Sequence, residues 1–165
     1  MTSTVLSTAT TISGLFDSLV AVPRSLTTFY EGQDQEPTPT GMWASVSVAF
    51  DRSNQQDMGD PTGRRFRTTG VMSVVVLNKP GVGDADILTT IDQIIDAFRA
   101  KTIVTGSGAS GTTTITFRSC YPVGPMIDTR KADAIVLGLR TQADNSWVCR
   151  TVQAPFYFDD YSASS

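Results

Sequence analysis

The chain has no histidine among its 165 residues, few charged residues and only two cysteines. Without histidine, Ser–His and Cys–His catalytic pairs and histidine-ligated zinc sites are excluded, and the usual proton shuttle near neutral pH is missing. Charged residues make up 18% of the chain, which is low for a free soluble monomer, whereas the 40% hydrophobic fraction is too high for a disordered one. The composition therefore argues against most hydrolytic and metal chemistry.

The two cysteines, Cys120 and Cys149, lie far apart and belong to no C-x-x-C pair, which makes a poor metal site. A domain of this length can bury a core without disulfides. We therefore expect two free, partly buried thiols in a reducing compartment, with a disulfide between them as the alternative.

The sequence also lacks long apolar runs and early basic residues. No run approaches about 18 consecutive apolar residues, so no membrane span is predicted. The first basic residue is Arg24, so no secretory signal is predicted, and we expect a protein made in the cytoplasm. The net charge of −3 argues against binding of duplex DNA through overall charge and leaves only a local basic patch.

Two segments have the apolar spacing of amphipathic helices. Pro23 is expected to end the first, and Gly83 or Asp84 to cap the second, which has acidic residues in its first turn. The apolar stripe of the first helix is Ile12, Leu15, Phe16, Leu19 and Val20, and that of the second is Ile87, Leu88, Ile91, Ile94, Ile95 and Phe98.

Alternating or continuous apolar patterns predict the strands of a sheet. These strands are Leu26–Tyr30, Met42–Phe50, Arg64–Leu77, Thr112–Phe117, Ala134–Thr141 and Trp147–Ala154. Polar or Pro/Gly-rich stretches predict loops, turns or breaks at Glu31–Gly41, Asp51–Gly63, Gly106–Gly111, Tyr121–Pro125 and Asp144–Ser146. The order of elements predicts one α+β domain over residues 1–165, with helices packed on a mostly antiparallel sheet and long projecting loops. Residues 1–10 and 162–165 are expected to be flexible.

The motifs that suggest chemistry are weak. Gly106–Gly111 matches G-x-G-x-x-G, but a threonine-rich strand follows where a dinucleotide site needs a helix, so we interpret it as a turn. Asp159 and Asp160 are adjacent on a predicted strand and would point to opposite faces. We therefore assign no catalytic residue, metal ligand or cofactor site, and expect no enzyme.

Positive charge is concentrated at Arg52, Arg64, Arg65 and Arg67, around Phe66. One interpretation is a solvated strand end. The other, which we favour, is an interaction arm, because arginine makes two bonds to a carboxylate or phosphate and suits protein interfaces.

Several short motifs resemble one known family. GRRFRTTG (residues 63–70) leads into the apolar strand Val71–Leu77, PGVG (80–83) precedes the second helix, and the chain closes on Trp147, Val152 and PFYFD (155–159). This layout resembles the tail terminator proteins of long-tailed bacteriophages, the group that includes the lambda tail terminator.

The resemblance implies a non-enzymatic structural virion protein at the neck end of the tail. Such subunits form a hexameric ring that caps the tail tube, stops its polymerisation and joins it to the head–neck connector. DNA passes through the lumen, and a net-negative ring would suit passage without binding. Two alternatives stay open: another phage head–tail completion protein, or a cellular α+β domain that binds a small ligand or nucleic acid.

Overall fold

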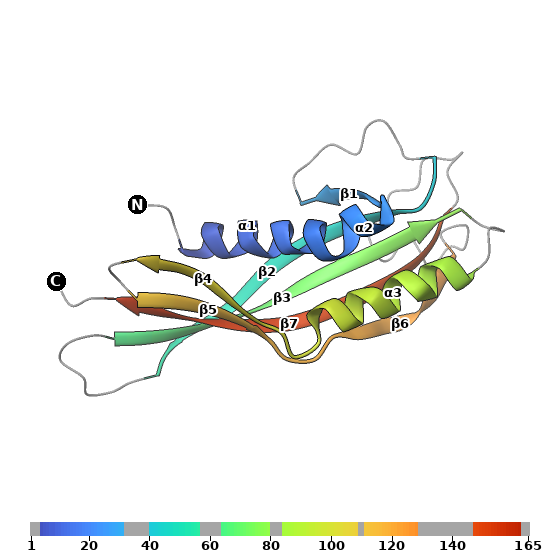
Figure 1. The fold of residues 1–165 in the computed structure, drawn as a ribbon. Coiled ribbons are helices and arrows are strands. Elements are labelled where there is room, and N and C mark those ends of the chain that lie inside the picture. The colour runs from blue at the N-terminus through green and yellow to red at the C-terminus, as the bar shows by residue number, and fades with distance from the viewer. Residues whose placement is uncertain are drawn as a thin grey trace.

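The computed structural model describes residues 4–31, 40–56, 64–79, 84–108, 111–128 and 147–162. They form one long, curled sheet of seven strands, with the helices packed against one of its faces (Figure 1). The helical elements are α1 (Thr4–Phe16), η1 (Asp17–Ala21), α2 (Val22–Arg24) and α3 (Asp84–Phe98). The strands are β1 (Thr27–Tyr30), β2 (Trp43–Gln55), β3 (Arg64–Asn78), β4 (Thr102–Gly108), β5 (Gly111–Phe117), β6 (Tyr121–Asp128) and β7 (Val148–Ser162).

The sheet has the strand order β1-β2-β3-β7-β5-β4, and β6 also pairs with β7. Strand β1 runs parallel to β2, whereas all other neighbours are antiparallel. The predicted α+β class with a mostly antiparallel sheet is therefore confirmed. The long apolar strand β3 lies between β2 and β7, the central position that its continuous apolar half predicts.

The first helix differs from the prediction at both ends. It begins at Thr4, inside the stretch expected to be flexible, and continues past Pro23 to Arg24. The π-helical segment η1 ends at Ala21, two residues before Pro23, which occupies the first turn of α2, the part of a helix in which proline is tolerated. Ser25, in the left-handed conformation with φ 52°, ends the helix.

Length and composition alone would let the 20 residues Val5–Arg24 cross a membrane, since their mean hydropathy is 1.5. In the fold, Ile12, Phe16 and Val20 have no exposed area and pack into the core between helices and sheet. In all, 28% of the span is buried, and one such helix near the N-terminus is weak evidence for a membrane span.

Helix α3 has the predicted bounds and nearly the predicted stripe. Ile87, Ile91, Ile94, Ile95 and Phe98 are buried as expected, but Leu88 is 42% exposed. Thr90 is fully buried in its place, because Arg24 Nη1 donates to its hydroxyl at 2.8 Å and the hydroxyl donates to the Asp86 carbonyl. A polar side chain is thus buried with its hydrogen bonds made.

Two strands extend through segments predicted as a loop and a break, and a third runs beyond its predicted end. Asp51–Gln55 belongs to β2, and Tyr121–Pro125 lies in β6. The predicted C-terminal strand continues through Pro155 to Ser162 as β7. Ladder hydrogen bonds from a neighbouring strand do not depend on side-chain polarity, and edge strands tolerate proline, so pattern alone placed these ends too early.

Strand β4 has no counterpart in the prediction, where only the turn Gly106–Gly111 was expected nearby. Gly106 and Gly108 close β4 and Gly111 opens β5, with Gly108 paired to Gly111. No helix follows these glycines, so the dinucleotide alternative is excluded and a hairpin takes its place. The predicted strand at Ala134–Thr141 and turn at Asp144–Ser146 lie outside the described residues, as does most of the loop Glu31–Gly41.

Each face of the sheet has its own apolar cluster. The main core joins the helices to residues such as Val74 and Val152, while a second cluster of Trp43, Leu77, Trp147 and Cys149 covers the other face. Both cysteines are buried and free, which confirms that expectation. Cys120 belongs to the main core and Cys149 to the second cluster, so the sheet separates them.

Candidate interaction surface

The basic end of β3 is held against β7. The register places Arg67 opposite Asp159 and Arg65 opposite Tyr161. Arg67 donates to Asp159 from Nε at 2.8 Å and from Nη2 at 3.0 Å, and Arg65 Nη2 also donates to Asp159 Oδ2. Because side chains alternate along a strand, both arginines lie on the face away from the helices and share one carboxylate.

This cluster determines the charge of Asp159. Hydrogen bonds from Arg67 hold the pKa of the Asp159 carboxyl below its usual value, with Arg65 adding to the effect and burial partly opposing it. The carboxyl is therefore ionised at neutral pH. Two guanidinium groups against one carboxylate leave a net positive charge at this end of the sheet.

A tyrosine ring lies between two of the cations on this face. The Arg67 guanidinium lies 4.3 Å from the centroid of the Tyr157 ring, and that of Arg118 lies 5.2 Å from it. Both distances are within the range of cation–π attraction. Arg65, Arg67, Arg118, Tyr157 and Asp159 therefore form one surface cluster, which we call the arginine cluster.

The structure brings together only part of the predicted interaction arm. Arg65 and Arg67 meet at Asp159, but Phe66 falls on the opposite face by strand alternation, and Arg52 lies on β2 with its side chain 77% exposed. Its guanidinium is 4.0 Å from Asp51. The backbone of Arg64 pairs with Ser162, so the basic segment is an internal strand bordered by β2 and β7.

The sequence prediction missed Tyr157, Asp159 and Arg118 as members of this surface. Asp159 was considered as a catalytic carboxylate and as part of a family motif, and Tyr157 only as part of that motif. The signal for Tyr157 and Asp159 lies in the register between β3 and β7, two strands that are separated by most of the second half of the chain. Arg118 follows β5 and joins the cluster through its contact with the Tyr157 ring.

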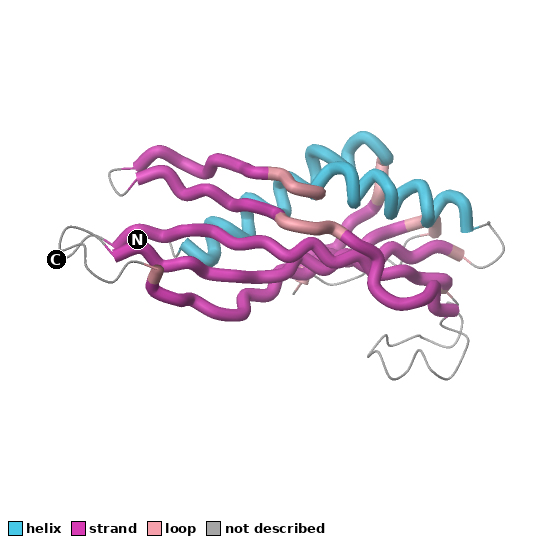
Figure 2. Tube along the Cα trace, turned by 90° about the horizontal axis from the view of Figure 1, so that it is seen from below, coloured by secondary structure: helices cyan, strands magenta, loops and turns pink. Residues whose placement is uncertain are grey.

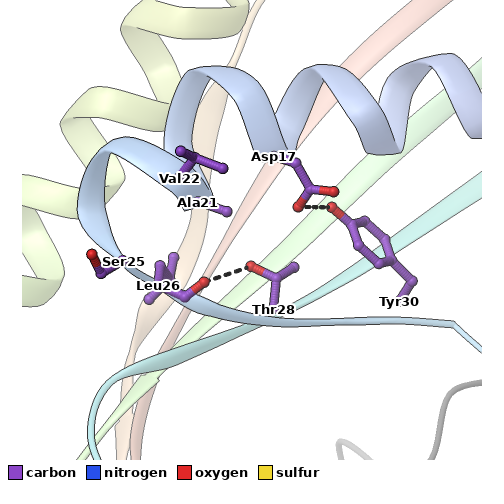
Figure 3. Close-up of a pocket in the computed structure, with 7 residues that line it drawn as sticks. All are labelled: Asp17, Ala21, Val22, Ser25, Leu26, Thr28 and Tyr30. Atoms are coloured by element: carbon purple, nitrogen blue, oxygen red, sulfur yellow. Dashed lines mark hydrogen bonds between the residues drawn. The ribbon is translucent and has the colours of Figure 1, made fainter.

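At the other end of the sheet, a groove of about 440 Å³ opens between the end of the first helix and β1 (Figure 3). Tyr30 donates from its hydroxyl toward Asp17 Oδ1 at 2.6 Å and the Ser13 carbonyl at 3.0 Å. Burial, followed by the hydrogen bond and the negative charge of Asp17, raises the pKa of Tyr30 above its ordinary value. The groove is lined by Asp17, Ala21, Val22, Ser25, Leu26, Thr28 and Tyr30.

In the lining of the groove, the side chains of Asp17 and Tyr30 are hydrogen-bonded to one another. In the described part of the chain, no three acidic or cysteine side chains gather as metal ligands. Among the described residues, two surfaces have functional potential: the arginine cluster at one end of the sheet and the open groove at the other. Figures 1 and 2 show the long strands that run between these two ends.

Comparison with known proteins identifies the family. A family model described as phage tail terminator protein matches residues 8–136, which is most of the chain. This protein therefore belongs to the phage tail terminator family and is a structural component of the phage tail that associates with other tail components. None of the curated proteins matches it. One solved structure aligns over 93% of this chain and 96% of its own, with 17% identity and a TM-score of 0.46.

Proposed function

We propose that this protein forms a ring that caps the phage tail tube, ends its polymerisation and joins the tail to the head–neck connector. Membership of the tail terminator family over residues 8–136 carries the proposal. The role is structural rather than enzymatic, and the ring is hexameric, as in the lambda-type terminators that the sequence resembles. The protein is assembled in the cytoplasm of the bacterial host and lies at the neck end of the virion.

Two features of the described surface support such a role. A ring needs two different contact faces on each subunit, because heterologous contacts close by rotation. The arginine cluster and the groove beside β1 lie at opposite ends of the sheet and differ in chemistry, one being cationic and the other lined by mostly apolar and hydroxyl groups.

We also propose that DNA passes through the lumen without specific binding. The net charge of −3 is consistent with a channel that does not retain phosphate. The arginine cluster would then lie away from the channel, at a contact with the tube or a neighbouring subunit. A lumen lined by these arginines would contradict this part of the proposal.

Negative-stain microscopy of the protein mixed with tail-tube subunits tests the function. Rings at tube ends, with tube elongation arrested, are the expected result. A monomer that leaves tube growth unchanged would refute it, and rings that bind only the portal or adaptor would favour a completion protein.

A charge reversal separates an interface role of the basic residues from a role in folding. Arg65 and Arg67 are unsuitable because they hold Asp159, so reversing them would also weaken the fold. Arg52 is exposed, and Arg52→Glu should reduce capping while leaving the melting temperature unchanged. The matched control is Lys79→Glu, an exposed charge beyond the other end of β3, which should cap normally. Normal capping by Arg52→Glu would remove Arg52 from the interface.

A further inference from the structure

We infer that β4 of one subunit pairs with β1 of the next, so that the sheet continues from copy to copy around the ring. This inference rests on the ring of the proposed function and names the contact that closes it. Strands β1 and β4 end the strand order of the sheet. Among the described residues, no strand pairs with the far edge of either one, and such an edge is a template for another strand.

Two other edges of the sheet, those of β2 and β6, are protected against pairing. The far half of β2 has a bulge between Phe50 and Ser53 and the exposed charges Asp51 and Arg52. Strand β6 contains Pro122 and an irregular stretch around Gly124, whose φ is 69°. Bulges, charges and prolines are the devices that stop edge-to-edge association.

Strand β1 and the first half of β4 lack these devices. Thr27–Tyr30 and Thr102–Thr105 contain no proline and no charged residue, and their registers are regular. The register shift in β4 falls between Thr105 and Ser107, after this stretch. The strands at the two ends of the strand order thus both have an edge that is free of protection.

Side chains on the two edges fit one another. Val104 is 67% exposed on β4, a large exposure for an aliphatic residue in a strand. The groove lies on the helix side of β1, and Thr28 helps to line it. A paired β4 would place Ile103 toward this groove and Val104 beside Phe29 on the opposite face, the alternation by which an added strand is recognised.

The strand directions allow this pairing in a ring. Strand β1 is parallel to β2, and the antiparallel steps to β3, β7, β5 and β4 make β4 run in the same direction as β1. Rotation about the ring axis keeps the strand direction of each copy, so it can place β4 beside β1 of the next copy as a parallel pair. A closed heterologous ring requires a contact of this kind.

The stagger of the two edges has the size that a closed barrel needs. Through the registers, Thr27 is level with Cys149 of β7, and Thr102 is level with Tyr157, eight residues further along. The stagger is therefore about 26 Å along the strands. Each subunit takes up about 29 Å across the strands, which is six strand spacings when the proposed contact with the next subunit is included. The strands would tilt by about 40° to the ring axis, within the 35–45° typical of barrels. In Figure 1 this stagger along the strands places β4 toward the left of the sheet and β1 toward the right.

Cysteine crosslinking tests the pairing. In a start-to-start register, Thr27 lies opposite Thr102 of the neighbour, and both side chains are exposed. Adjacent strands bring Cα atoms within disulfide range. The variant Thr27→Cys with Thr102→Cys, bound to tail-tube ends and oxidised, should give a ladder of covalent multimers on a non-reducing gel. Each single-cysteine variant should give no species above a dimer.

The matched control joins the protected edges, with Ser53→Cys on β2 and Tyr121→Cys on β6, and should give no ladder. Rings at tube ends without a ladder from the first pair, or with a ladder from the control pair, would overturn the strand pairing and leave the capping function standing. Absence of wild-type rings on tubes would overturn both.

A second variant uses no crosslink. Val104→Lys places a charge on the proposed edge, and because Val104 is exposed, the melting temperature should not change. Tube-end occupancy should fall at least tenfold. Unchanged occupancy would contradict the proposed pairing.

Discussion

Arg67 and Asp159 face each other directly across β3 and β7, and the guanidinium binds the carboxylate through both Nε and Nη2. Two parallel N–H···O bonds fix the geometry as well as the charge. Arg65 uses the same carboxylate, so removal of Asp159 leaves two arginines without this partner. The pair connects strands that are far apart in the sequence and therefore acts as a clamp at the basic end of the sheet.

Asp159→Asn should lower the free energy of unfolding by about 1.5–3 kcal/mol, the range for hydrogen bonds to charged groups. Urea denaturation at pH 7 measures it. Asp51→Asn is the matched control, because Asp51 is exposed and lies 4.0 Å from Arg52, and a surface pair of this kind contributes little. Equal effects of the two substitutions would show that the clamp does not stabilise the fold.

The same carboxyl predicts a loss of stability in acid. The folded-state pKa of Asp159 lies below its unfolded value, chiefly because of Arg67. Its contribution is therefore complete above the ordinary aspartate pKa of about 3.9, and it is lost as the pH falls through the lower folded-state pKa. Denaturation curves between pH 2 and 7 should show a smaller acid-side loss for Asp159→Asn than for the wild type. Identical pH profiles would contradict this assignment.

Gly70 marks a position where β3 leaves no room for a side chain. A Cβ there would lie 2.5 Å from Cζ of Phe156 and 2.6 Å from the Ala49 carbonyl oxygen. Gly70→Ala should destabilise the protein by about 1–3 kcal/mol, the usual cost of overpacking.

Gly14→Ala is its control. A Cβ at Gly14 meets nothing within 4 Å, and alanine in a helix interior is favoured over glycine by about 1 kcal/mol. Thermal unfolding should therefore move in opposite directions for the two variants. A stabilising Gly70→Ala would mean that β3 and β7 pack less closely than described.

Tyr30→Phe should cost about 1 kcal/mol, because it removes the hydroxyl that bonds Asp17 and the Ser13 carbonyl. Tyr121→Phe, at an exposed residue, should change stability little. The raised pKa of Tyr30 means that its contribution is complete below about pH 10, the ordinary tyrosine pKa, and is lost as the pH rises through the folded-state value. Alkaline absorbance titration should show one late-ionising tyrosine that Tyr30→Phe removes; an unchanged titration would refute the assignment.

Cys120 and Cys149 should resist alkylation in the folded protein and react fully after unfolding. Burial raises the pKa of the Cys120 thiol to about 11, with Arg99 opposing part of the shift, and burial also raises the pKa of Cys149. Since the thiolate is the reactive form, both reactions should be slow. Mass spectrometry of unreduced, unfolded protein should show two added labels; no label on either cysteine would mean a disulfide.

The predictions from sequence succeeded where one element alone sets the pattern. The 3.6-residue spacing from Ile87 to Phe98 predicted α3, because a helix makes its hydrogen bonds within itself. The apolar run that ends at Leu77 predicted the central strand, because a strand that is covered on both faces has apolar side chains at successive positions. This pattern is again local to one element. The predictions failed at Asp51–Gln55 and at Tyr121–Pro125, where pairing with another strand supplies the hydrogen bonds.

By itself, the sequence determined the α+β class, the two helices, the position of β3 and the resemblance to tail terminators. Only the tertiary structure decided that Arg65 and Arg67 meet Asp159, that Phe66 falls on the other face, and that β1 and β4 end the sheet. The physical reason is range. Side-chain periodicity is a local property of the chain, whereas register and strand order depend on contacts between segments that the sequence keeps far apart.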